Sequence, residues 1–247
     1  MNEGTPNTPV ASRPAPVHDG LVGGSLSDGW NAFKYDPVVL VGFVILKAPL
    51  AALAGWLLSG GWYAFELLHP YAFGHLGELR RTMLGIFTCL LDGFLTVGML
   101  YSALRVLRRQ ATPFTQLFSG FTKPLPVLIA YILVNFAVGI GILFLIIPGI
   151  IIALVLSQWQ FLIMDRNADG VEAVSGSWRL MKGHVLDYFL LWVVLIFINL
   201  AGAIPVGLGL FVTVPYTYAV QAAFYNRIAG STEAEPESSR EPLVAPS

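Results

Sequence analysis

Long runs of apolar residues, each close to the length of a membrane-spanning helix, dominate this sequence. A helix needs about 20 apolar residues to cross the hydrocarbon core of a bilayer. Only 12% of the residues are charged, against about 25% in an ordinary soluble domain. Backbone N–H and C=O groups in lipid must form their hydrogen bonds within the same segment, so we expect these runs to be helices. The sequence predicts six transmembrane helices, near residues 38–60, 83–104, 125–146, 150–164, 185–203 and 206–225.

The predicted helices are grouped in three pairs. Ile147-Pro148-Gly149 separates the third from the fourth, and Ala203-Ile204-Pro205 separates the fifth from the sixth. Proline removes a backbone donor and clashes with the preceding turn, so we expect hairpins there rather than long kinked helices. The fourth run is short enough that a re-entrant segment is the alternative to a full crossing. A longer outer loop, 61–82, joins the first pair.

Each hairpin is preceded by a short stretch in which small and aromatic residues lead to a lysine. These stretches are 28–34, 116–123 and 175–182. In the third, apolar residues recur at helical spacing, Asp169 and Glu172 have capping-box spacing, and Gly183 follows as a C-terminal cap. At this spacing, the apolar residues lie on one face of a short amphipathic helix. They are Val171, Val174, Trp178 and Met181. The sequence thus predicts an all-α membrane bundle whose three hairpins each follow a short interfacial amphipathic helix, a packed loop helix being the alternative.

Basic residues are divided unevenly between the two sides that six crossings define. The side of the membrane that faces away from the two termini carries only Arg80 and Arg81. Because cytoplasmic loops are enriched in Lys and Arg, this bias predicts that both termini are cytoplasmic. The side that holds the termini carries Arg13, Lys34, Arg105, Arg108, Arg109, Lys123, Arg166, Arg179, Lys182, Arg227 and Arg240.

The two ends of the chain have the composition of disordered tails, since they are poor in apolar residues. We therefore expect tails over 1–24 and 230–247 and a single transmembrane domain over 25–229. The formal net charge of −1 offers no basic field for nucleic acid.

Lys47 and Asp92 interrupt the first and second apolar runs near their centres. An ionised group there costs about 2.5–3.5 kcal/mol on insertion scales. Each lies roughly 14 Å from the start of its helix, and in antiparallel helices the two depths nearly coincide within a core of about 30 Å. An intramembrane ion pair is therefore feasible. A structural clamp, snorkelling of Lys47 and coupling of a proton or substrate are the three interpretations.

Sequence motifs for catalysis are absent: there is no HExxH, CxxC, Walker loop or GxSxG. His69 and His75 share the outer loop, but two ligands without carboxylate support make a poor metal site. We expect no enzyme activity, no cofactor and no metal.

A composite motif in the second half of the chain resembles a known pattern. It consists of Ile147-Pro148-Gly149-Ile150, a span, Asp165, and then Glu172-Ala173, Ser177 and Lys182-Gly183. The pattern resembles that of a broad group of uncharacterised bacterial polytopic inner-membrane proteins. This group looks similar to the membrane domain fused to some glycerophosphodiester phosphodiesterases and to YciC-type membrane proteins.

The resemblance covers about 117–227 and implies the fold and an inner-membrane location. The phosphodiesterase chemistry belongs to a separate soluble domain, so no catalytic residue is carried over. We expect a non-enzymatic role in structure, envelope maintenance or partner binding, with membrane lipids and a protein partner or second copy as contacts. The alternative is a transporter or lipid-handling permease that uses Lys47 and Asp92.

Overall fold

The computed structural model describes residues 20–47, 49–50, 53, 74–204 and 207–234. Every regular element within these ranges is helical, which confirms the predicted all-α class. The elements are α1 (Leu21–Tyr35), a short apolar helix over Pro37–Lys47, α3 (Gly74–Leu107), the 3-10 helix η1 (Phe114–Thr122), α4 (Pro124–Phe144), α5 (Ile146–Val155), α6 (Trp159–Asp165), α7 (Gly170–Met181), α8 (Val185–Ala203) and α9 (Leu210–Ala234).

Four helical stretches of the described chain are long and apolar enough to cross a membrane. The fourth predicted span is α5 and α6 together, a stretch of 20 residues. At about 1.5 Å per residue, this length matches a hydrocarbon core of about 30 Å. The second part of the first predicted span, 38–60, lies largely outside the described residues, which include 38–47 but not 54–60. The four stretches are Thr82–Leu107, Pro124–Phe144, Ile146–Asp165 and Val185–Ala203.

The sixth predicted span, 206–225, falls mainly on α9, which is not among the four apolar stretches. α9 carries polar residues such as Gln221 and Asn226 and lies at the centre of the packed core. A helix enclosed by other helices does not need the apolar surface that lipid demands. The arrangement of six spans in three hairpins stays a prediction. The fully buried residues of α9 are Ala219, Val220, Ala222, Ala223, Phe224, Tyr225 and Ile228.

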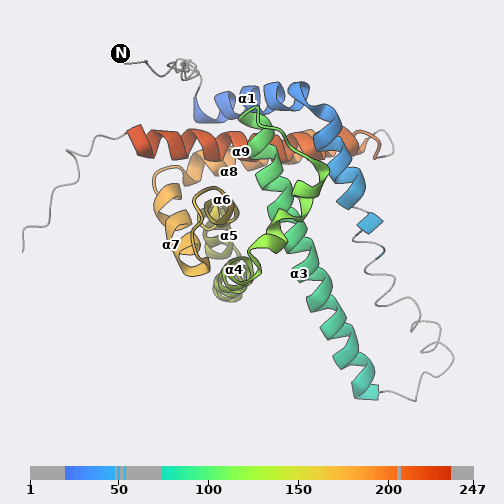
Figure 1. The fold of residues 1–247 in the computed structure, drawn as a ribbon. Helices are drawn as coiled ribbons and strands as arrows, with labels where there is room; N and C mark the ends of the chain where they lie inside the picture. The colour runs from blue at the N-terminus through green and yellow to red at the C-terminus, as the bar shows by residue number, and fades with distance from the viewer. Residues whose placement is uncertain (1–19, 48, 51–52, 54–73, 205–206, 235–247) are drawn as a thin grey trace, which may run out of the picture.

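The helices do not share one direction. In Figure 1, α1 and α9 lie side by side, α3 crosses them and projects away from the other helices, and α4 is seen nearly end-on. α9 contacts α1, α3, α7 and α8, so it connects the N-terminal helix to the second half of the chain. The core is therefore built around α9 rather than around a bundle of parallel spans.

The α4–α5 hairpin, the second of the three predicted pairs, turns at Leu145, where the backbone is extended (φ −165°, ψ 145°). Our prediction of a break at Ile147-Pro148-Gly149 is therefore wrong by a few residues. Pro148 is the third residue of α5, a position whose N–H has no partner within a helix, so proline is tolerated there. Gly149 lets the two helices approach closely. A Cβ added at Gly141 would lie 2.8 Å from the Gly149 Cα.

The hairpin of α8 and α9 has a similar glycine contact. A Cβ added at Gly209 would lie 2.5 Å from the Gly202 carbonyl oxygen. Gly207 adopts a left-handed conformation (φ +79°), which favours glycine. The side chain of Asn199 donates a hydrogen bond of 2.8 Å to Thr217 and so links the two helices. Both hairpins of the second half are thus held by backbones in direct contact.

Three boundaries differ from the prediction. α3 begins at Gly74, so residues 74–82, which we assigned to the outer loop 61–82, are helical, in keeping with good helix formers such as Leu76 and Glu78. α1 begins at Leu21, within the expected tail 1–24, because Leu21 and Val22 pack against the core. α9 continues to Ala234, past the expected boundary at 230.

Substitution of Gly141 tests the close contact in the α4–α5 hairpin. We expect Gly141→Ala to lower stability by about 1–3 kcal/mol, because its Cβ meets backbone that cannot move aside cheaply. Gly139→Ala is the matched control two residues away, since nothing lies within 4 Å of its Cβ. Thermal unfolding in mild detergent should show a lower Tm for the first variant only. Equal Tm values for both variants would contradict the close packing.

Candidate functional site

The structure brings Lys47 and Asp92 together. Lys47 Nζ lies 2.9 Å from Asp92 Oδ1 and donates a hydrogen bond of 2.8 Å to Thr96 Oγ1. Thr96 Oγ1 donates in turn to the Asp92 carbonyl at 2.8 Å. The Lys47 side chain is 15% exposed and the Asp92 side chain 55%, so the lysine is the enclosed partner. These contacts fix the short helix Pro37–Lys47 against α3.

The apolar stretch Ile146–Asp165 is broken near its middle, where α5 ends at Val155 and α6 begins at Trp159. A break leaves backbone groups without helical partners, which is costly in an apolar environment. Ser177 of α7 satisfies both sides of this break. Its hydroxyl donates to the Val155 carbonyl at 2.9 Å and accepts from the Gln158 N–H at 3.0 Å. Ser177 is fully buried, so water does not compete for these bonds.

Both ends of α7 follow the predicted signals. The Asp169 carboxylate accepts the N–H of Glu172 at 2.7 Å and so caps the first turn. Gly183, with φ +91°, follows the exposed Lys182 and reverses the chain before α8. The family-like motif of this region is therefore built largely from residues that start, stop and dock α7.

The predicted apolar face of α7 is only partly buried, and its interfacial placement stays a prediction. Met181 is buried, but Val171 and Trp178 are 58% and 57% exposed. The packed face is instead made of small residues and two larger apolar ones. Small residues let α7 approach α4 closely: a Cβ at Gly170 would lie 2.7 Å from the Pro126 carbonyl oxygen. The buried residues are Gly170, Ala173, Ser177, Leu180 and Met181.

Asp165 belongs to a charged network that joins the ends of α3, α6 and α9. It forms a bidentate ion pair with Arg108, in which one of the two hydrogen bonds measures 3.0 Å. Tyr225 donates a further hydrogen bond to Asp165 at 3.0 Å, and Arg108 Nε donates to Asn226 at 3.1 Å. Burial lowers the pKa of Arg108, but the hydrogen bond and charge of Asp165 outweigh burial and raise it. The network ties three helix ends together.

Two further cations are engaged near these helix ends. Lys123, just before α4, donates to the carbonyl of Ile163 in α6 at 2.6 Å, and burial lowers the pKa of its ammonium group. Arg227 of α9 forms an ion pair of 2.7 Å with Asp28 of α1. These contacts place the end of α6 beside the start of α4, and α1 beside the end of α9.

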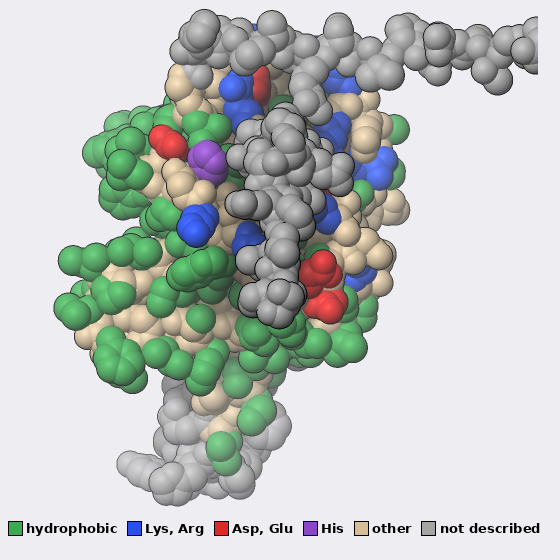
Figure 2. Space-filling view, turned by 90° about the vertical axis from the view of Figure 1, so that its left-hand side faces the viewer, with side chains coloured by type: hydrophobic (Ala, Val, Ile, Leu, Met, Phe, Trp, Pro, Cys, Tyr) green, Lys and Arg blue, Asp and Glu red, His purple; other side chains and the backbone are tan. Residues whose placement is uncertain are grey.

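We call the surface that carries these charges the charged end. It comprises the ends of α3, α6 and α9 together with α1 and α7. Figure 2 shows that Lys, Arg, Asp and Glu side chains gather over one region, while hydrophobic side chains cover the lobe at the lower left. The defining residues of the charged end are Asp28, Arg108, Lys123, Asp165, Arg166, Glu172, Arg179 and Arg227.

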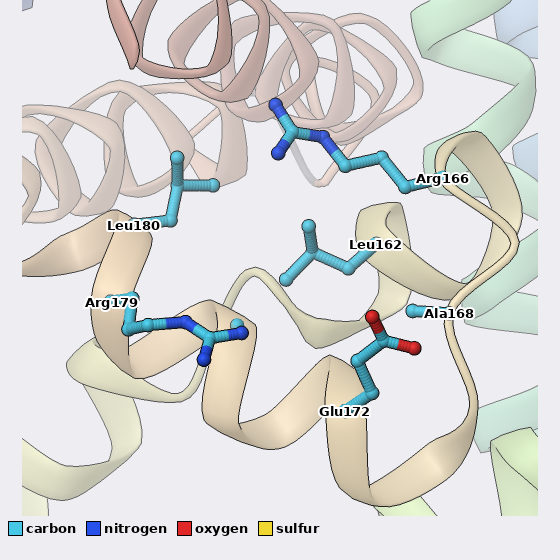
Figure 3. Close-up of a pocket in the computed structure, with 7 residues that line it drawn as sticks. Leu162, Arg166, Ala168, Glu172, Arg179 and Leu180 are labelled. Atoms are coloured by element: carbon cyan, nitrogen blue, oxygen red, sulfur yellow. The ribbon is translucent and has the colours of Figure 1, made fainter. Parts of the chain in front are cut away.

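A pocket of about 320 Å³ opens between the end of α6 and α7 on the charged end. Its apolar wall consists of Leu162, Ala168, Gly176 and Leu180, and its charged wall of Arg166, Glu172 and Arg179. In Figure 3, the side chains of Arg166 and Arg179 extend from opposite sides with Leu162 between them, and the Glu172 carboxylate rises from α7 near Ala168.

The sequence indicates part of this site. Lys47, Asp92, Asp165, Glu172 and Ser177 stand out by their place in an apolar span or in the composite motif. The partners that these residues meet do not stand out by type or local spacing, so the sequence does not predict them. Arg166 and Arg179 stand out in the sequence only as basic residues that indicate the orientation of the helices. Nothing in the sequence predicts that they line one pocket. The partners that sequence reasoning missed are Thr96, Val155, Gln158 and Tyr225.

Residues 138–232 match the model of a family described as a protein of unknown function (DUF975). The match begins within α4 and ends within α9, so it includes both glycine-containing hairpins and α7. Similarity to an uncharacterised family is thereby confirmed, while the links to YciC-type proteins and to phosphodiesterase-fused membrane domains stay predictions. No curated protein and no solved structure matches the chain significantly.

Removal of the Ser177 hydroxyl tests its role at the helix break. We expect Ser177→Ala to lower stability by about 1–3 kcal/mol for each buried group left unsatisfied, namely the Gln158 N–H and the Val155 carbonyl. Ser175→Ala is the control on the same helix, because the Ser175 hydroxyl is exposed and bonds only within α7. Chemical denaturation in detergent measures both. If Ser177→Ala leaves the free energy of unfolding unchanged, the backbone groups at the break must have other hydrogen-bond partners.

Proposed function

We propose that this chain is a non-enzymatic integral protein of the inner membrane, with both termini in the cytoplasm, that acts by binding lipid or a protein partner at its charged end. One observation carries the proposal: among the described residues, the side chains of the charged end are set apart from the α4–α5 and α8–α9 turns, where the described residues are mostly exposed and apolar. A soluble protein rarely exposes such a patch. Exposed residues of the turns include Leu143, Phe144, Leu145, Ile146, Ile147, Ile204 and Leu208.

The contacts of the charged end support a binding role over a catalytic one. Arg108, Asp165 and Tyr225 satisfy one another, and Arg227 pairs with Asp28. Such groups hold helix ends in place and are not poised to exchange protons with a substrate. The pocket between α6 and α7 adds an open space of about 320 Å³, which is large enough for a ligand.

The orientation can be tested with reporter fusions. A fluorescent protein that folds only in the cytoplasm, fused after Ser247, should be fluorescent in cells. Alkaline phosphatase fused at the same place should be inactive. A periplasmic signal from the C-terminus would contradict the proposed topology, and recovery of the chain in the soluble fraction would contradict membrane integration.

A transporter or permease is the second candidate, and the position of the Lys47–Asp92 ion pair beside an apolar span favours it. An ionisable pair within an apolar span is by default a candidate site for proton or substrate coupling. The same ion pair serves equally as a clamp, since Lys47 is enclosed and anchored on Thr96.

Substitutions of the ion pair separate these two functions. Lys47→Met alone should destabilise the protein by about 2.5–3.5 kcal/mol, because it leaves the Asp92 carboxylate unpaired in an apolar span. Lys47→Met combined with Asp92→Leu should restore Tm and should complement a deletion strain as well as the wild type does. A double variant that folds normally in detergent but fails to complement would contradict the clamp and favour coupled transport.

A further inference from the structure

We propose that the turn between α1 and the short helix Pro37–Lys47 binds the headgroup of an anionic phospholipid. This inference deepens the proposed function and rests on it, because a headgroup meets this turn only if the helices beside it cross a membrane. Lys34 and Arg109 recognise the phosphate, and exposed aromatic rings hold the turn at the membrane surface. We call this surface the elbow, and its residues are Trp30, Lys34, Tyr35, Asp36, Val38 and Arg109.

The elbow lies where a helix long enough to cross a membrane comes to an end. In Figure 1, α1 lies across the C-terminal end of α3, and the helix Pro37–Lys47 turns away from α1 to run beside α3. The apolar stretch of α3 ends at Leu107, two residues before Arg109. With α3 in a bilayer, the elbow is therefore at the level where the hydrocarbon core gives way to headgroups.

The two cations of the elbow lie over aromatic rings. Lys34 Nζ is 5.8 Å from the centre of the Trp30 ring, and Arg109 Cζ is 5.1 Å from the centre of the Tyr35 ring. These distances are typical of cation–π contacts. The second contact joins the end of α3 to the end of α1, so it brings both cations to the same turn. Because an aromatic ring has no net charge, both cations keep their full charge for an anion.

The charge of the elbow favours an anion. Among the described residues, neither Lys34 nor Arg109 forms an ion pair with a carboxylate, whereas the neighbouring Arg108 does. Asp36 is the acidic residue of the elbow, and its carboxylate accepts the N–H of Val39 at 3.1 Å. The elbow therefore has an excess of one positive charge, which suits a phosphodiester with a single negative charge.

The exposed side chains of the elbow favour a lipid as the source of this anion. Trp30 is 45% exposed, Tyr35 53% and Val38 71%. Tryptophan and tyrosine are enriched at the headgroup level of a bilayer, and basic residues next to a span attract anionic lipids. Val38 lies in the first turn of the apolar helix that follows. A lipid bound here contacts Val38 with its acyl chains and Lys34 and Arg109 with its phosphate.

Binding to the purified chain in mild detergent tests the proposal. The probes are short-chain phosphatidylglycerol, short-chain phosphatidylcholine and inorganic phosphate, and the dependence of Tm on probe concentration gives Kd. We expect only phosphatidylglycerol to raise Tm. Lys34→Gln with Arg109→Asn should raise its Kd by about twenty-fivefold, or about fivefold for each cation removed. Asparagine is chosen because it tolerates the left-handed backbone of Arg109 (φ +54°).

Two further changes separate a specific site from a general electrostatic effect. Asp36→Asn removes the acidic group but keeps a side-chain oxygen that can accept the Val39 N–H, so it should lower the Kd by about fivefold. Arg179→Gln with Lys182→Gln is the matched control, because it removes the same charge from exposed positions at the end of α7. This control should bind phosphatidylglycerol as the wild type does.

A single substitution covers the case in which the double variant of the elbow does not fold. Lys34 is exposed, so Lys34→Gln alone should fold and should raise the Kd for phosphatidylglycerol by about fivefold. An unchanged Kd in the folded elbow variants would overturn the site. So would an equal loss of binding in the α7 control.

The other outcomes separate the source of the anion and the two proposals. Equal rises in Tm with phosphatidylglycerol and inorganic phosphate would assign the cations to a soluble anion and overturn the lipid. Equal rises with phosphatidylglycerol and phosphatidylcholine would overturn recognition by charge. Membrane integration stands in each of these cases. Recovery of the chain in the soluble fraction would overturn the proposed function instead.

Discussion

The hydroxyl of Ser177 is the contact on which the second half of this fold depends. The apolar stretch Ile146–Asp165 contains a break, and a broken helix in an apolar environment must find partners for its freed backbone groups. Ser177 supplies a donor and an acceptor at once and so docks α7 across the break. Once α7 is docked there, its residues and those at the end of α6 together form the pocket between the two helices.

Close contacts between helix backbones stabilise the α4–α5 and α8–α9 hairpins. Gly141 with Gly149, and Gly202 with Gly209, allow each pair of helices to approach more closely than side chains would permit. Helices that associate in lipid gain little from apolar burial, so close packing and interhelical hydrogen bonds such as Asn199 to Thr217 supply the stabilisation. The charged network around Asp165 then fixes the helix ends at the charged end.

The sequence predicted these features unevenly, for physical reasons. Apolar length predicted the helical class and the span Val185–Ala203, because lipid constrains length and polarity directly. The hairpin turn was misplaced because Pro148 is compatible with the first turn of a helix as well as with a loop. The predicted apolar face of α7 is divided, with Met181 buried and Val171 and Trp178 exposed, because small residues such as Ala173 and Ser177 let the opposite side of the helix pack closely. Long-range partners such as Tyr225 carry no local signal.

The docking of α7 by Ser177 is the central claim, and amide hydrogen exchange tests it directly. The peptide that contains Gln158 should exchange slowly in the wild-type protein in lipid nanodiscs, because its N–H donates to the buried Ser177 hydroxyl. In Ser177→Ala, exchange should accelerate in that peptide and in α7 but not in α8. Equal exchange of the Gln158 peptide in both proteins would contradict the claim.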